Sequence, residues 1–114
     1  MTLDQIITRL GLTLLTEPKN FSNITSAAGY ASDMLSCVMS GASKHSIWIT
    51  LQAHVNIVAV AALLDLSAII VTEDAPVDES TISKANEKGV TLLLTPLSSF
   101  EIAGRLWEMG LRAG

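Results

Sequence analysis

The sequence has few charged residues and one cysteine, and both shortages exclude classes of function. Charged residues make up 16% of the 114 residues, against about a quarter in an average globular protein. The lone Cys37 cannot form an internal disulfide, and without a Cys-x-x-Cys pair the sequence predicts neither a redox-active dithiol nor a zinc site. We therefore expect a cytoplasmic protein without a metal or other cofactor.

Positive charge is also scarce. Seven Lys and Arg residues are spread along a chain of net charge -4, which disfavours binding to nucleic acid or to an anionic membrane. The first ten residues, which include Asp4 and Arg9, do not resemble a signal peptide. Residues 46–64 are nearly uncharged but contain three polar residues near their middle, unlike a membrane span of about 20 apolar residues. We expect neither nucleic acid nor membrane as a partner.

The residues that are present repeat a strand-helix pattern three times. The strands begin at Ile47, Ala68 and Val90, each closes on a threonine, and helices are expected at about residues 53–64, 79–88 and 97–109. Upstream, the pattern predicts a helix at residues 3–10, a strand at 12–16, a weaker strand at 24–28 and a helix beginning near Ala31. These elements predict a single α/β domain over residues 1–114, with a mostly parallel sheet of about five strands flanked by helices.

Two of the expected helices have more apolar surface than one sheet can cover. Residues 53–64 carry no charge and should be buried on several sides. Residues 97–109 carry two apolar stripes, and the second stripe needs another helix from this chain or from a second copy. The stripes are Leu97, Phe100, Gly104 and Trp107, and Ile102, Leu106 and Met109. A homodimer is therefore expected.

The carboxyl ends of parallel strands usually form the ligand site of such a sheet. The expected ligand-binding residues at this edge are Tyr30, Asp33, Thr50, Gln52, His54, Asn56, Thr72, Thr95 and Ser98. Neutral polar groups beside helix N-termini favour a small polar or anionic ligand over a metal, and Glu73 and Asp74 would repel a multiply charged one. Alternatively, Gln52 or His54 only caps the following helix.

Three segments of the sequence resemble stand-alone DRTGG-domain proteins over about residues 24–111. They are residues 29–36 (Gly-Tyr-Ala-Ser-Asp-x-Leu-Ser), 48–61 (Trp-Ile-Thr-x-Gln-x-His-x-Asn-x-Val-Ala-Val-Ala) and 95–106 (Thr-Pro-x-Ser-x-Phe-Glu-x-Ala-Gly-Arg-Leu). The resemblance implies a fold like the N-terminal domain of HPr kinase/phosphorylase. It also implies a regulatory or dimer-forming role, as for the DRTGG domains of phosphotransacetylases and CBS-domain pyrophosphatases. This sequence has Gln52-Ala53-His54 where many members have Asp-Arg, and Glu73-Asp74 where they have Gly-Gly.

Three functional hypotheses follow. The first is a non-catalytic regulatory or ligand-sensing homodimer, since no Ser-His-Asp order, P-loop or Gly-x-Gly-x-x-Gly motif occurs. The second is a small enzyme with His54 as general base, assisted by Asp33 or Glu73. The third is an adaptor that binds a protein and no ligand. The resemblance also suggests a protein partner in a redox or signalling pathway.

Overall fold

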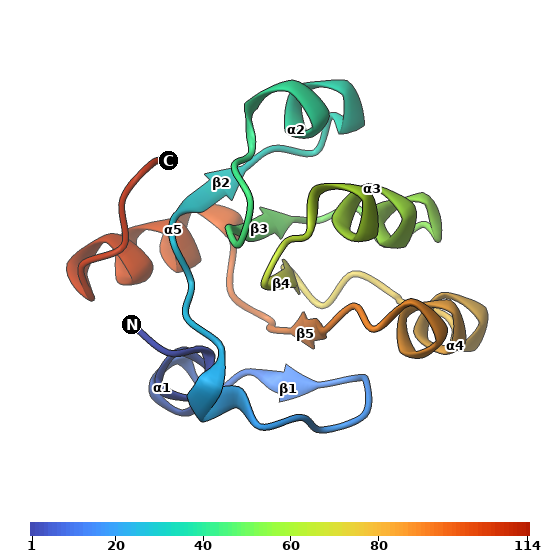
Figure 1. Cartoon of the computed structure of the whole chain (residues 1–114), viewed down its shortest axis with the longest axis horizontal. Helices are drawn as coiled ribbons and strands as arrows, with labels where there is room; N and C mark the ends of the chain where they lie inside the picture. The colour runs from blue at the N-terminus through green and yellow to red at the C-terminus, as the bar shows by residue number, and fades with distance from the viewer.

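The computed structural model describes residues 1–114 as a five-stranded sheet between two layers of helices (Figure 1). The elements are α1 Leu3–Leu10, β1 Thr13–Leu14, the short 3-10 helix η1 Phe21–Asn23, β2 Gly29–Ala31, α2 Leu35–Gly41, β3 Ile47–Thr50, α3 Asn56–Leu64, β4 Ala68–Val71, α4 Glu79–Lys88, β5 Leu92–Leu94 and α5 Ser99–Glu108. The strand order is β1-β5-β4-β3-β2, and all neighbours are parallel except β1 and β5. The predicted α/β fold is confirmed.

The central strands are buried along their whole length because both faces of the sheet are covered. One face packs against α2, α3 and α4 through Trp48, Ile69, Val71 and Leu92. The other face packs against α1 and α5 through Ile47, Ile49, Ile70 and Leu93. Figure 1 shows the three crossover helices on one side of the sheet and α1 with α5 on the other. The loops that follow the parallel strands therefore meet at one edge.

Local capping chemistry sets the ends of α1 and α4 as expected. Thr2 and Gln5 form a reciprocal capping box at the start of α1, and Gly11 ends that helix in the left-handed conformation (φ 60°). Asp78 caps α4 by accepting from the Thr81 N–H, and Gly89 (φ 70°) ends it. These four boundaries confirm the sequence predictions.

The prediction of a strand at residues 24–28 is wrong, because β2 begins at Gly29. The Ile24 carbonyl accepts from the Leu3 N–H and the Ser26 N–H donates to the Met1 carbonyl, so the first half of this segment follows the start of α1. Backbone bonds to the β3 side begin only at Ala27, whose N–H donates to the His45 carbonyl. Pairing with Ile47–Ile49 starts at Gly29, where an added Cβ would lie 3.3 Å from Leu111. Close packing by the C-terminal segment therefore places a glycine in this edge strand.

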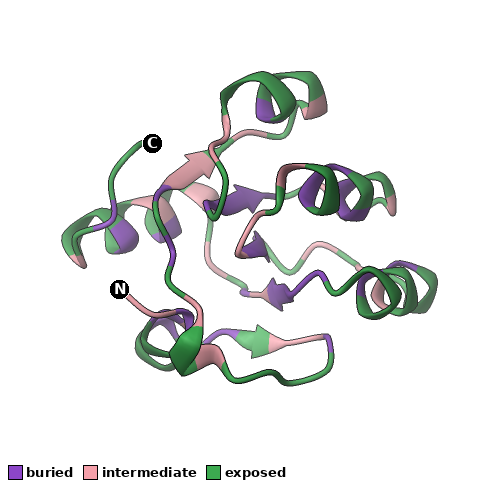
Figure 2. Ribbon diagram, viewed as in Figure 1, coloured by how far each residue is buried: buried purple, intermediate pink, exposed green.

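Helix α3 begins three residues later than expected and is less covered than expected. The His54 Nδ1 atom accepts from the Asn56 N–H (3.2 Å), which keeps residues before 56 in a loop. In the single chain, Ala59, Ala62 and Leu63 are exposed, so this chain by itself does not bury the helix on several sides (Figure 2). No helix has both the length and the apolarity needed to cross a membrane.

The two apolar stripes of α5 have opposite environments, as the sequence predicted. Ile102 and Leu106 are fully or almost fully buried against the sheet. Phe100 is 90% exposed and Trp107 is 56% exposed. The stripe that contains Phe100 and Trp107 therefore faces outward from the chain.

Candidate functional site

Three buried threonines end β3, β4 and β5 at the carboxyl edge of the sheet. The Thr50 hydroxyl accepts from the Gln52 N–H at 3.0 Å. The Thr72 hydroxyl lies 2.7 Å from that of Ser99, and the Thr95 hydroxyl accepts from the Leu97 N–H at 3.2 Å. These hydroxyls hold the loops in place, so their contribution to a ligand site is to position its walls.

Asp33 joins the loop after β2 to the loop after β3. Its Oδ1 atom accepts from the Thr50 hydroxyl at 2.8 Å and from the Leu51 N–H at 2.9 Å. The Gln52 side-chain amide donates back to the Asp33 carbonyl at 3.2 Å. Asp33 thus forms one hydrogen-bonded cluster with Thr50 and Gln52, which follow it by 17 and 19 residues.

His54 and Asn56 lie at the start of α3, with both residues exposed. Because the His54 Nδ1 atom accepts from the Asn56 N–H, the neutral ring carries its proton on Nε2, which remains available as a donor. The pKa of Asp78 is held below its ordinary value of 3.8, first by the hydrogen bond from the Thr81 backbone, and last by the charge of His54.

Glu73 and Asp74 form a left-handed turn after β4, with φ of 58° and 51°. The Glu73 N–H donates to the Leu97 carbonyl at 2.9 Å, and the Asp74 N–H donates to the Thr95 carbonyl at 3.0 Å. This turn ties the loop after β4 to the loop after β5. Both carboxylates are on exposed residues beside the edge.

Two of the expected ligand-binding residues have other contacts. The Tyr30 hydroxyl donates to the Cys37 carbonyl at 3.1 Å, beneath α2. The Ser98 hydroxyl caps α5 by accepting from the Glu101 N–H at 3.2 Å. Among the expected ligand-binding residues, the exposed side-chain donors that make no such bond are the Nε2–H group of His54 and the amide of Asn56.

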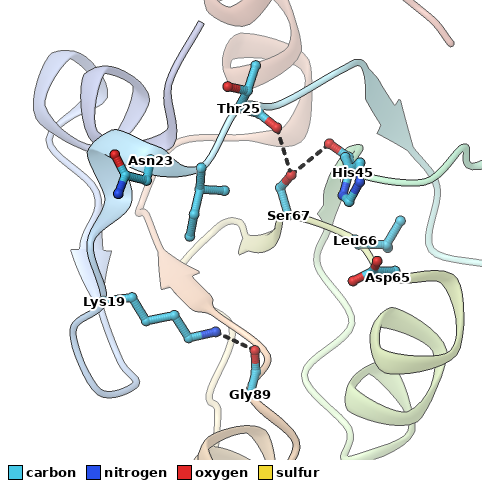
Figure 3. A pocket seen from close by; sticks show the side chains of 9 residues that line it. Lys19, Asn23, Thr25, His45, Asp65, Leu66, Ser67 and Gly89 are labelled. Carbon is cyan, nitrogen blue, oxygen red and sulfur yellow. Dashed lines mark hydrogen bonds between the residues drawn. The ribbon is translucent and has the colours of Figure 1, made fainter.

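The sequence reasoning missed a hollow of about 430 Å³ at the opposite, amino-terminal edge of the sheet (Figure 3). Its lining is Lys19, Asn23, Ile24, Thr25, His45, Asp65, Leu66, Ser67 and Gly89. The Ser67 hydroxyl donates to the His45 carbonyl at 2.7 Å, the Lys19 ammonium donates to the Gly89 carbonyl, and Asp65 pairs with Lys44 at 3.6 Å. These polar groups already bind one another and join segments of the fold.

A second hollow, of about 390 Å³, lies between α3 and α4. Its lining is Val55, Asn56, Val58, Ala59, Ala62, Lys84 and Lys88. The only sequence feature that could have indicated this hollow is the absence of charge in α3. That feature was interpreted as a sign that the helix is buried.

The family comparison now agrees with this geometry. The model of the DRTGG domain family matches residues 5–109. The chain belongs to the DRTGG domain family. The match extends further toward the N-terminus than the segments that carry the resemblance. Among curated proteins, no relative matches this chain.

A solved structure of a DRTGG domain shows the same fold. It is the crystal structure of the CBS and DRTGG domains of the regulatory region of Clostridium perfringens pyrophosphatase, complexed with the activator diadenosine tetraphosphate. The TM-score is 0.74 at 21% sequence identity, and the match covers 90% of this chain and 44% of that one. This DRTGG domain therefore spans less than half of the pyrophosphatase region that it matches.

Proposed function

We propose that this DRTGG domain is a non-catalytic regulatory module that senses a small polar or anionic ligand at the carboxyl edge of its sheet and acts as a homodimer. The similarity to a regulatory region that was crystallised with an activator supports a regulatory role. We do not extend the activity of the whole pyrophosphatase to this chain, because the match covers only 44% of the regulatory region.

The observation that carries the proposal is a series of hydrogen bonds that joins all the edge loops to α5. Asp33 links the first two loops, and the Thr72 N–H donates to the Thr50 carbonyl at 2.9 Å. The Thr72 hydroxyl then bonds Ser99 in the first turn of α5. A ligand that shifts an edge loop would therefore act on α5, whose outer stripe is the expected dimer surface.

The ligand half of the proposal rests on His54 and Asn56. Their free side-chain donors lie at the start of α3, where the helix dipole also favours an anion. The neighbouring carboxylates of Glu73 and Asp74 oppose a multiply charged group. We therefore expect a ligand with one or two negative charges.

Calorimetric titration of wild type and of Gln52→Ala/His54→Ala tests this site, with phosphate, acetyl phosphate and nucleoside monophosphates as probes. The expected result is binding of at least one probe by wild type and a large loss in the variant. Asn23→Ala/His45→Ala is the matched control, because it removes an amide and an imidazole from the opposite edge. Equal binding by wild type and the edge variant would move the site elsewhere.

The dimer half rests on the outer stripe of α5. Phe100, Gly104 and Trp107 share one face of the helix, and a Cβ added at Gly104 would meet nothing within 4 Å. Two α5 helices crossing at Gly104 could approach closely, with Phe100 of each copy against Trp107 of the other. Burial of these aromatic side chains would stabilise the pair.

Size-exclusion chromatography with light scattering should give twice the chain mass of 12.1 kDa. Phe100→Ser/Trp107→Ser should give a monomer, whereas Leu63→Ser on α3, which removes a residue that is 70% exposed, should remain dimeric. A wild-type protein that is strictly monomeric at tens of micromolar would contradict the dimer. A wild-type monomer that captures a host protein through this stripe would favour the adaptor hypothesis instead.

The geometry supports the enzyme hypothesis less than it supports the regulatory one. Asp33, a suggested partner of His54, already accepts from Thr50 and Leu51. A screen for turnover with nucleotides and acyl phosphates, repeated with His54→Ala, tests this alternative. Turnover that disappears in a folded His54→Ala variant would support it.

A further inference from the structure

The hollow between α3 and α4 has the size and lining of a small-molecule site. Its volume of about 390 Å³ falls within the range of about 300–1,000 Å³ that ligand pockets occupy. Four of its seven lining residues are the apolar Val55, Val58, Ala59 and Ala62 of the α3 side. It shares only Asn56 with the proposed edge site.

Helix α3 leaves this apolar wall open to solvent. None of its nine residues is charged, although Ala59 and Ala62 are exposed. These alanines lie one turn apart, so their small side chains leave a hollow beside α4. A surface helix normally carries charged residues on its solvent face, and α3 has none there. The composition of α3 therefore suits contact with the apolar part of a small molecule.

Helix α4 supplies positive charge to the rim of the same hollow. Lys84 and Lys88 are one turn apart and both line it. Lys84 pairs only with the exposed Glu87, at 3.7 Å, and such an exposed pair holds its partners weakly. Lys88 takes part in none of the three ion pairs of the chain. Two ammonium groups are therefore free to meet an anion above the apolar wall.

We infer that the hollow between α3 and α4 binds a small amphipathic anion, whose compact apolar body contacts Val58, Ala59 and Ala62. Its carboxylate, phosphate or sulfonate group binds Lys84 and Lys88. Asn56 donates a further hydrogen bond at the end near the carboxyl edge. The inference goes beyond the proposed edge site, because neither His54 nor Gln52 contributes to it.

Anilinonaphthalene sulfonate is a suitable probe, because its uncharged analogue phenyl-naphthylamine lacks only the sulfonate. Fluorescence titration of the wild-type chain should show binding of both probes. Lys84→Gln/Lys88→Gln should weaken sulfonate binding by roughly threefold to tenfold, the sum expected for two exposed charge contacts, and should leave phenyl-naphthylamine binding unchanged. Added salt should weaken binding of the charged probe alone.

Lys19→Gln/Lys44→Gln is the charge-matched control, since neither lysine lines the hollow between α3 and α4. It should bind both probes like wild type, and thermal melts check that each variant is folded. Ala62→Glu, which places a carboxylate on the exposed wall, should also exclude the sulfonate probe.

Amide NMR shifts locate the bound probe. Shifts in residues 55–62 and 84–88 support the inference. Shifts confined to residues 99–111 would place the probe on α5, and shifts confined to residues 51–54 and 72–75 would place it at the edge; either result overturns the inference. The second result would leave the proposed edge site intact, so the two proposals fail separately.

Discussion

Replacing Glu73 with glycine should stabilise the fold. Glu73 has a left-handed backbone (φ 58°), and Asp74 after it has φ 51°. A Cβ in this conformation crowds the following carbonyl oxygen, whereas glycine has no Cβ. The two N–H groups bonded to Leu97 and Thr95 hold the turn in place, so the strain cannot relax by local rearrangement.

The size of the effect follows from two opposing terms. A left-handed residue with a Cβ loses about 1–2 kcal/mol relative to its preferred conformation. Glycine loses about 0.5–1 kcal/mol through its greater freedom in the unfolded chain. The net gain for Glu73→Gly is therefore about 0.5–1 kcal/mol, or about 2–5 °C in Tm for a domain of this size. Asp74→Gly should gain less, because aspartate tolerates this conformation better.

Thermal and urea unfolding of Glu73→Gly and Glu73→Ala measure this gain. The two variants lose the same carboxylate, but alanine keeps the Cβ, so only glycine should raise the free energy of unfolding. If the glycine variant is no more stable than the alanine variant, the left-handed turn is not strained and the reasoning fails. A gain shared by both variants would instead assign the effect to removal of the charge.

The remaining predictions concern two aspartates. Asp33→Ala should lower the free energy of unfolding by about 1–3 kcal/mol, because the Thr50 hydroxyl and the Leu51 N–H lose their acceptor; Asp33→Asn should lose less in the same urea titration, and equal losses would contradict this explanation. The pKa of Asp78 is lowered on folding, first by the Thr81 backbone bond, so its stabilising effect is complete above pH 3.8 and is lost as the pH falls further. When the pH is lowered from neutral to below 3.8, the Tm of Asp78→Asn should therefore fall by less than the Tm of wild type. Equal decreases in Tm would contradict the role of this carboxylate.

The elements that the sequence predicted well have local signals. The capping box of Thr2 and Gln5, the cap at Asp78 and the glycines at 11 and 89 each act within a few residues of the chain. Such chemistry can be identified before any tertiary contact is known. The β3, β4 and β5 strands were predicted for a similar reason, because each is a short apolar run that both faces of the sheet bury.

Strand β2 depends on distant contacts, which explains why its position was not predicted. Its three residues carry no apolar alternation, and its register comes from pairing Gly29 with Ile47. The approach of Leu111 to Gly29 adds a contact from the far end of the chain. Neither contact leaves a pattern in residues 24–31 themselves, so a neighbouring stretch was chosen instead.

The meeting of the loops at one edge was predicted, because strands that run parallel end at the same edge of the sheet. Which side chains bind one another depends on register, which the sequence does not contain. Asp33 was expected to face a ligand, and it binds Thr50 and Leu51. The hollow beside α3 was missed because the exposure of Ala59 depends on how much of α3 is covered by α4. Helical periodicity does not predict how closely two helices pack.

The turn at Glu73 and Asp74 has a left-handed backbone but contains no glycine. Glycine would suit this backbone better, because it has no Cβ. Since Glu73 and Asp74 keep that backbone, the bonds from their N–H groups to the loop after β5 do not require glycine. The two carboxylates add negative charge at this turn, whereas glycine residues at the same positions would leave only backbone groups there. In the proposed edge site the two carboxylates therefore disfavour a multiply charged ligand, while their N–H groups still connect the β4 and β5 loops.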